Sequence, residues 1–383
     1  MHKLTITTAA LALLSAPAFA LEPEDLKGQE ITAEQYDELV AAAKEVTPPR
    51  NGDEYIFGFA NLQRDIPFGV KTEQGIEANA EKAGIELLVT DNRLDGAVAL
   101  QNAESYVRRN VDYVIEFQTD VNFGPTVMQK FNEADIPVTA IDIPMPGATF
   151  FGANNPRSGF MGGAFLAQAA IAEWGEEAVN DGYLVVGELP QSGAIPAMRT
   201  GGQIAGFQAV VEDFPEDQII RIDTKNTLQE SFTQMNNVIG RIPQGVPIMG
   251  IAINDQSVTG MLRATTQAGR ADNALFVGMG ADEVETLATE ERLIASVGYF
   301  PERYGNYLVP IALMELAGVD VPPAVLVNHV MVTKANICEF YDVECGEGPD
   351  FEYTFPQEAF EEHLASLRGK EELQGYETLI PSN

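Results

Sequence analysis

The sequence predicts an α/β protein made of two doubly wound parallel-sheet lobes. From residue 55 onward, apolar strand-like runs alternate regularly with helical runs. The alternation pauses at a long helical stretch over 159–174 and starts again at residue 183. Such alternation is typical of βαβ units, whose parallel strands are joined by right-handed crossovers. The 383 residues also exceed the ~250–300 at which a single hydrophobic core stops growing, which favours two lobes.

Each expected strand is a short apolar run that ends in polar or glycine-containing turns, and each expected helix has apolar residues at helical spacing. In the first lobe the strands are 55–60, 85–90, 111–117 and 138–141, and the helices are 69–83, 96–109 and 122–134. In the second lobe the strands are 183–187, 219–222, 248–253, 274–278 and 293–297, and the helices are 198–211, 227–239, 258–268 and 283–290.

The first twenty residues have the pattern of a secretory signal. His2 and Lys3 precede an apolar core over 4–14, and a small-residue cleavage site follows, with cleavage expected after Ala20. This core is too short to span a bilayer, which takes about 20 apolar residues. The alternative is an apolar N-terminal helix that stays attached. An acidic extension over 21–51 follows, with one helical stretch at 33–46.

The charge balance excludes several classes of partner. The chain has 57 acidic and 23 basic residues, for a formal net charge of -34. A surface with this charge repels nucleic acid and anionic membranes. A phosphate-binding loop of the GxxxxGK[ST] type is absent from the sequence, and we expect neither a cofactor nor a metal ion.

The segment 248–282 indicates where a ligand binds. Two apolar strand-like runs end in polar tips, the first at Asn254 and Asp255 and the second at Gly280 and Asp282, with a helical run between them. In an open parallel sheet, ligands bind just outside the carboxyl ends of the strands. Asn254, Asp255 and Asp282 are therefore expected at a ligand-binding edge.

Cys338 and Cys345 lie seven residues apart near the C-terminus. In an oxidising compartment they could close a small loop as a disulfide. A metal-binding pair is the alternative, but the nearest histidines are His329 and His363. The disulfide is the favoured interpretation. The tail from Gly346 is acidic, and we expect it to pack on the surface of the molecule.

Several short motifs follow one another between about residues 55 and 332. They are Phe59-Ala60-Asn61 with Ile66-Pro67-Phe68-Gly69 and Gly75, Glu116-Phe117-Gln118-Thr119-Asp120, Ile136-Pro137-Val138 with Ile141-Asp142, Gly206-Phe207-Gln208 with Val210, and Asn254-Asp255 with Gly260, Ala264 and Ala268-Gly269. In this order and behind a signal, they resemble the periplasmic sugar-binding proteins of ribose and galactose type. These are type I periplasmic binding proteins, the solute receptors of ABC importers.

The resemblance implies a substrate-binding protein that captures a carbohydrate or polyol between two lobes and delivers it to a permease in the inner membrane. It implies a periplasmic monomer, and transfer of the ligand signal to a chemoreceptor is a further role. The expected lobes are 52–155 with 300–328, and 156–299 with 329–340, followed by an acidic extension over 341–383. Three hinge crossings are expected near 154–157, 298–301 and 327–330.

The resemblance also places the site. Rings for the apolar faces of a sugar come from Phe68 and from Phe117 or Tyr299, and polar contacts come from Asp142, Asn254, Gln118 and Arg199. Asp65 and Asp282 are weaker candidates. Three positions depart from the ribose type: Ile143 replaces an arginine, Gly280 an aspartate and Tyr299 a glutamine. These departures count against ribose itself, and a pentose, hexose, polyol or sugar acid remains open.

Each candidate also has a structural interpretation. Phe68 and Phe117 could belong to the core, Asp142 could cap a turn, Asn254 could cap the following helix, and Arg199 could form a surface ion pair. The rival class is a hydrolase that uses carboxylates. A hydrolase with a serine nucleophile is a different possibility, and it is disfavoured because a G-x-S-x-G elbow is absent from the sequence.

Overall fold

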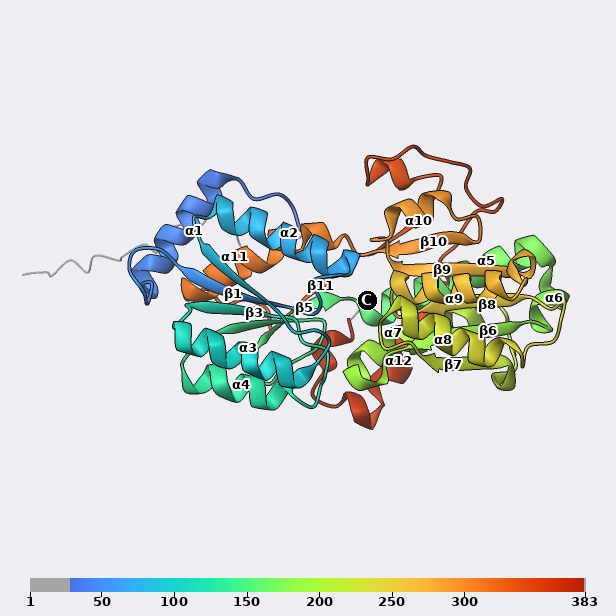
Figure 1. Ribbon diagram of the computed structural model, residues 1–383, viewed down its shortest axis with the longest axis horizontal. Coiled ribbons are helices and arrows are strands. Elements are labelled where there is room, and N and C mark those ends of the chain that lie inside the picture. Colours follow the sequence, from blue (N-terminus) through green and yellow to red (C-terminus); the bar gives the residue numbers. More distant parts are fainter. Residues whose placement is uncertain (1–27, 382–383) are drawn as a thin grey trace, which may run out of the picture.

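The computed structural model describes residues 28–381 and contains two six-stranded sheets, each covered by helices on both faces (Figure 1). This confirms the predicted α/β architecture. The expected signal and its cleavage site lie outside the described residues. Among the described residues, none of the helices has both the length and the apolar character needed to cross a bilayer.

The first sheet has the strand order β11-β5-β4-β3-β1-β2, and all its pairings are parallel. Its strands are β1 (Ile56–Asn61), β2 (Glu86–Asp91), β3 (Tyr113–Glu116), β4 (Val138–Ile141), β5 (Thr149–Ala153) and β11 (Ala324–Val327). Its helices are α1 (Ala33–Val46), α2 (Pro67–Lys82), α3 (Gly96–Arg109), α4 (Gly124–Glu133) and α11 (Gly305–Leu316). One face packs on α1, α2 and α11, and the other packs on α3 and α4.

The second sheet has the order β12-β10-β9-β8-β6-β7. Its strands are β6 (Tyr183–Glu188), β7 (Ile219–Asp223), β8 (Ile248–Ala252), β9 (Ala274–Gly280), β10 (Leu293–Gly298) and β12 (Val330–Thr333). Its helices are α5 (Asn155–Trp174), α6 (Glu176–Asn180), α7 (Ala194–Gln208), α8 (Leu228–Ile239), α9 (Asp255–Gln267) and α10 (Val284–Thr289). We call the parts built on the two sheets the first and second lobes.

The edge strand β12 differs from the prediction of a parallel sheet, because it runs antiparallel to β10. The preceding strand, β11, belongs to the other lobe and ends at Val327, and β12 begins at Val330. The chain therefore enters the second lobe from the side of the junction. It then runs opposite to β10, which ends at that junction.

The chain passes between the sheets at three places. The first connection joins β5 to α5, the second joins β10 to α11, and the third joins β11 to β12. A short 3-10 helix, Pro301–Arg303, lies within the second connection. We call these segments the three crossings. They lie together at the centre of the molecule (Figure 1).

Two extensions pack on this frame. In the N-terminal extension, α1 begins with a capping box at Thr32, and the Tyr36 hydroxyl donates a 2.7 Å hydrogen bond to Asn79 of α2. The C-terminal extension contains α12 (Gln357–Arg368), which packs against α7 and α5, and its end reaches β11. It lies at the junction of the lobes (Figure 1).

Candidate functional site

A cavity lies between the lobes, at the carboxyl ends of strands from both sheets. The first lobe contributes lining residues that include Phe68, Phe117 and Asp142, and the second lobe contributes Arg199 and Asn254. Tyr299 lines the cavity from the second crossing. Of the nine residues expected at the site, these six are brought together. The rule that ligands bind at strand tips therefore finds the location of the cavity.

Asp142 follows β4 and combines a backbone role with a side chain at the cavity. Its φ is 57°, a left-handed conformation that Asp tolerates better than most residues. One carboxylate oxygen accepts a 2.9 Å hydrogen bond from the Ala153 amide on β5. Burial raises the pKa of this carboxyl, and the positive charge of Arg199 opposes the rise. The side chain therefore bonds to the end of β5, and not to the turn after β4 that the sequence left open, and it also lies at the cavity.

Arg199 projects from α7 and is 7% exposed. Its Nε donates to the side-chain oxygen of Asn155 at 2.9 Å, and its Nη1 donates to the Ile253 carbonyl at 2.8 Å. The guanidinium lies 4.9 Å from the centre of the Tyr299 ring. Within residues 28–381 it forms no ion pair within 4.0 Å, so it is not the surface salt bridge that the sequence left open. These neutral partners fix the cation at the cavity wall.

Asn254 is the N-cap of α9, and its side-chain oxygen accepts a 2.9 Å hydrogen bond from the Ser257 amide. Its amide group donates to the Asn226 carbonyl at 3.3 Å. It also lines the cavity, as Asn226 does. Asn254 therefore caps the helix and lines the cavity from the same position.

Three aromatic residues form an apolar part of the wall. The Phe68 ring meets those of Phe117 and Tyr299 edge-on, with centroids 6.1 and 6.5 Å apart. The Tyr299 hydroxyl donates a 2.9 Å hydrogen bond to the Ser158 hydroxyl, and burial raises its pKa to about 12. Rings of this kind are suited to the C–H faces of a sugar.

Asp65, Gln118 and Asp282 are not among the lining residues. Asp65 is exposed in the turn before α2. Gln118 is buried, and its amide nitrogen lies 3.7 Å from the position that a Cβ on Gly124 would occupy, on the α4 side of the sheet. Asp282 is buried beside Asp255.

Asp255 and Asp282 hold the tips of β8 and β9 together. One Asp255 oxygen accepts a 2.7 Å bond from the Ser296 hydroxyl, and the other accepts the Asp282 amide at 3.0 Å. Burial, together with the nearby charge of Asp255, raises the pKa of Asp282 well above its usual value. We therefore assign this pair to the structure of the turn.

The sequence did not single out several other lining residues, namely Thr119, Ser192, Asn226 and Met279. Asn226 follows β7 in a left-handed conformation with φ 62°. The strand-tip rule that identified Asn254 would have identified Asn226 had it been applied to β7. Ser192 lies in a 3-10 helix, Pro190–Ser192, for which the sequence has no strong signal.

The lobes touch at two places beside the cavity. On one side the Ser192 hydroxyl donates to the Thr119 carbonyl at 2.7 Å. On the other, Lys71 of α2 donates to the Asp282 carbonyl at 2.9 Å. These contacts join residues of opposite lobes directly, so the structure represents a closed arrangement. Residues 28–381 contain no group of three or more His, Cys, Asp or Glu side chains that could hold a metal ion.

The two lobes, the three crossings and the cavity between the lobes define a class: two-lobe proteins that bind a solute at the lobe interface. Residues 57–320 match the family model described as periplasmic binding protein domain. The match covers more than half of the chain, and the chain belongs to the periplasmic binding protein family. It is a binding protein and not an enzyme. This confirms the family resemblance seen in the sequence.

Curated relatives include the ribose import binding proteins of Bacillus subtilis and Escherichia coli. The first is 26% identical over 262 residues, which cover 67% of this chain and 80% of the relative. The second is 25% identical over 272 residues, which cover 70% and 87%. A solved ABC transporter solute-binding protein from Mycobacterium smegmatis, with bound glycerol, has the same fold at a TM-score of 0.63 and 20% identity, covering 78% of this chain and 100% of that one.

Proposed function

We propose that this protein is the substrate-binding component of an ABC importer and captures a carbohydrate or polyol in the cavity between its lobes. The observation that supports this most is the composition of the cavity wall. It combines a carboxylate (Asp142), a guanidinium (Arg199) and an amide (Asn254) with the rings of Phe68 and Tyr299. Hydroxyl groups both donate and accept hydrogen bonds, and such a wall meets both needs.

The relatives support the same class of ligand. The two curated relatives are named for ribose import. Here Ile143 and Met279 contribute apolar surface to the wall, and Tyr299 contributes a phenol. We therefore propose a pentose, hexose, polyol or sugar acid other than ribose as the ligand, delivered to a membrane permease by a chain that is exported and cleaved after Ala20.

A thermal-shift panel of pentoses, hexoses, polyols and sugar acids tests this proposal. A ligand at 100 times its dissociation constant stabilises the folded protein by about 2.7 kcal/mol, which is readily measured. We expect at least one carbohydrate or polyol to raise the melting temperature. A shift with an amino acid or a nucleoside, and with none of the carbohydrates or polyols, would refute the proposed ligand class.

A further inference from the structure

His329 lies in the third crossing and makes hydrogen bonds to the other two. Its Nε2 is 3.0 Å from the amide nitrogen of Asn154 in the first crossing. Its Nδ1 is 3.1 Å from the carbonyl oxygen of Gly298, where β10 enters the second crossing. One imidazole ring therefore joins all three segments that connect the lobes.

The hydrogen bonds fix the tautomer of this ring. The Asn154 amide is a donor, so Nε2 must be unprotonated in order to accept. The Gly298 carbonyl is an acceptor, so Nδ1 must carry the proton. The enclosing crossings lower the pKa of His329 to about 3 through burial, although part of the residue reaches the surface. At neutral pH the ring is thus neutral, and both nitrogens have partners.

The same ring touches the ligand cavity through one neighbour. The centres of the His329 and Tyr299 rings are 4.4 Å apart. Tyr299 lines the cavity, stacks with the Arg199 guanidinium, and bonds to Ser158 in the first turns of α5. Any rotation at the crossings that moves His329 would therefore disturb the wall that Tyr299 and Arg199 form.

We propose that His329 is a positioning residue that holds the three crossings in the closed arrangement and keeps Tyr299 in place at the cavity. This inference rests on the proposed function, because it concerns closure around the ligand. A ligand shifts an equilibrium between open and closed forms only by its difference in affinity for the two. Hydrogen bonds that favour the closed form lower the cost of closing and so strengthen the apparent affinity.

Three substitutions separate the hydrogen bonds from the ring contact. His329→Gln provides an amide that can donate to Gly298 and accept from Asn154, but it lacks the ring. His329→Phe keeps an aromatic ring against Tyr299 and loses both bonds, and His329→Leu loses both features. Trp174→Leu is the control, because Trp174 is also a partly buried ring but lies at the C-terminal end of α5, far from the first crossing at the other end of that helix.

The measurements are calorimetric affinity for the best carbohydrate of the panel, the radius of gyration with and without it, and amide exchange at Asn154. We expect His329→Phe and His329→Leu to bind about five-fold more weakly or worse, the factor that corresponds to one hydrogen bond of about 1 kcal/mol. They should also expose the Asn154 amide to exchange. His329→Gln should restore most of both properties, and Trp174→Leu should bind like the wild type.

The outcome that overturns the proposal is a lower melting temperature in His329→Phe and His329→Leu with unchanged affinity and unchanged closure. His329 would then support the fold and would not position the crossings. If the wild type binds no carbohydrate, the proposed function fails. The role of His329 is then decided on the ligand-free protein. His329→Phe and His329→Leu should protect the Asn154 amide less from exchange and change the radius of gyration, and His329→Gln should restore both. Equal exchange rates and equal radii in all variants would refute the proposal.

Discussion

Asp142 serves the backbone and the cavity at once, and this decides which substitution can test its role. Its left-handed φ of 57° and its bond to the Ala153 amide both favour Asp or Asn over Ala. Asp142→Asn keeps that conformation and an accepting oxygen but removes the charge. Asp142→Ala removes the preference for that conformation, the accepting oxygen and the charge, so it mixes effects on folding with effects on binding.

We predict that Asp142→Asn weakens binding of the best carbohydrate by about 5- to 150-fold, the effect of about 1–3 kcal/mol for a partner lost in a buried site. Its melting temperature without ligand should stay near that of the wild type. Asp142→Ala should weaken binding at least as much and also melt earlier. Calorimetry on the variants, with melting curves of the free proteins, measures both effects.

Asn254→Ser provides the comparison from the second lobe, because Ser retains the N-cap of α9 while it loses the amide. Its loss of affinity should be smaller than that of Asp142→Asn, since charged acceptors make the stronger hydrogen bonds. Normal binding by either variant would remove that residue from the ligand site.

Glu116 is a second buried carboxyl, and it is not among the lining residues of the cavity. One of its oxygens accepts a 2.8 Å bond from Asn92, and the other is buried without a hydrogen-bond partner. Burial raises its pKa from the usual 4.5 to about 8. In the folded state the group therefore keeps its proton over a pH range in which the unfolded chain has already lost it.

The sign of the pH effect follows from this difference in bound protons. Between about pH 4.5 and pH 8 the folded state binds more protons than the unfolded state, so the free energy of unfolding falls as the pH rises. We predict that Glu116→Gln, which resembles the protonated acid, is more stable than the wild type at pH 9 by at least about 1 kcal/mol, and that the difference shrinks toward pH 5.

Denaturant unfolding at several pH values measures this difference. Because the chain carries a formal net charge of -34, loss of any acidic group could relieve repulsion. Glu86→Gln is the control, since Glu86 is exposed on β2. An equal gain in both variants would show that overall charge, and not the burial of Glu116, explains the result.

The sequence located Asp142, Arg199 and Asn254 at the cavity but could not give the direction of each side chain. Phe117 and Gln118 are consecutive, and successive side chains of an extended segment point to opposite sides. Phe117 lines the cavity, and Gln118 points toward α4. Both could not be site residues from one extended segment, and this rule of alternation would have separated them.

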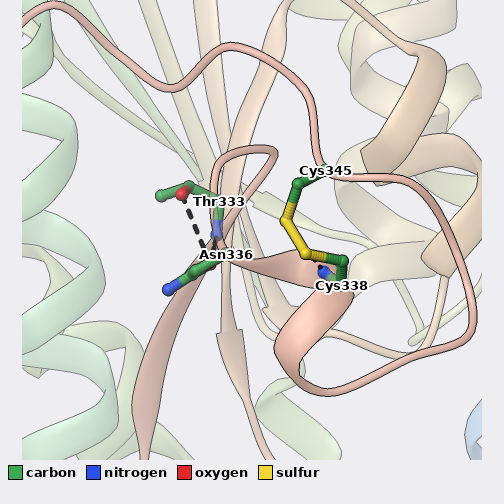
Figure 2. Close-up of a disulfide and its surroundings, with 4 residues drawn as sticks. All are labelled: Thr333, Asn336, Cys338 and Cys345. Carbon is green, nitrogen blue, oxygen red and sulfur yellow. Dashed lines mark hydrogen bonds between the residues drawn. A yellow bond between two sulfur atoms is a disulfide. The ribbon is translucent and has the colours of Figure 1, made fainter.

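At the scale of elements, a disulfide closes the loop that follows β12. Cys338 and Cys345 are bonded, with their Cα atoms 5.1 Å apart (Figure 2). The loop carries Phe340 and Tyr341, whose rings pack on Phe300 in the second crossing at 5.1 and 6.0 Å. Lys71 of the first lobe lies 5.0 Å from the centre of the Tyr341 ring. The closed loop therefore supports a crossing and contacts the opposite lobe.

We predict that the double variant Cys338→Ser, Cys345→Ser has a lower melting temperature than the oxidised wild type. Closing a loop of this size reduces the entropy of the unfolded chain by an amount worth about 2–3 kcal/mol. The reduced wild type should melt like the double variant, and a reducing agent should not affect the variant. If reduction leaves the wild-type melting curve unchanged, the loop does not contribute to global stability.

Some helices and strands were not predicted because their residues lack the alternation of apolar and polar positions that marks such elements in a sequence. Almost every residue of α11 is buried, and Pro310 lies inside it, so neither a polar face nor an uninterrupted pattern marks this helix. The strands β5 and β12 fall outside the alternation of strands and helices on which the prediction rested, because each directly follows another strand, β4 and β11 respectively. The strand β11 follows α11, the helix that was itself not predicted.

At the scale of the whole molecule, the C-terminal extension contacts both lobes. Its apolar side chains pack in one cluster with Phe150 of β5 and Leu326 of β11 from the first lobe, and with Phe160, Ile195 and Met198 from the second. The sequence predicted that this segment packs on the surface but gave no sign that it bridges two lobes. Contacts between distant segments depend on the assembled fold, which local patterns do not contain.

Periplasmic binding proteins as a class are a known example of hinge closure around a ligand, and such a protein should become more compact when its ligand binds. In this chain the C-terminal extension adds apolar contacts across the same junction. Opening must either stretch these contacts or carry the extension with one lobe. The extension should therefore limit how far the ligand-free protein opens.

We predict that removal of residues 351–383 increases the radius of gyration of the ligand-free protein and lowers its melting temperature, because the apolar cluster is exposed. Small-angle scattering with and without ligand measures the opening, and the contraction on binding should be larger in the truncated chain than in the full chain. Leu379→Ser with Ile380→Ser is the sharper variant, because it removes apolar contacts near β11 while α12 remains on α7. It should widen the ligand-free form with a smaller loss of stability. Equal radii for the full chain and both variants would mean that the extension moves with one lobe and does not restrain opening.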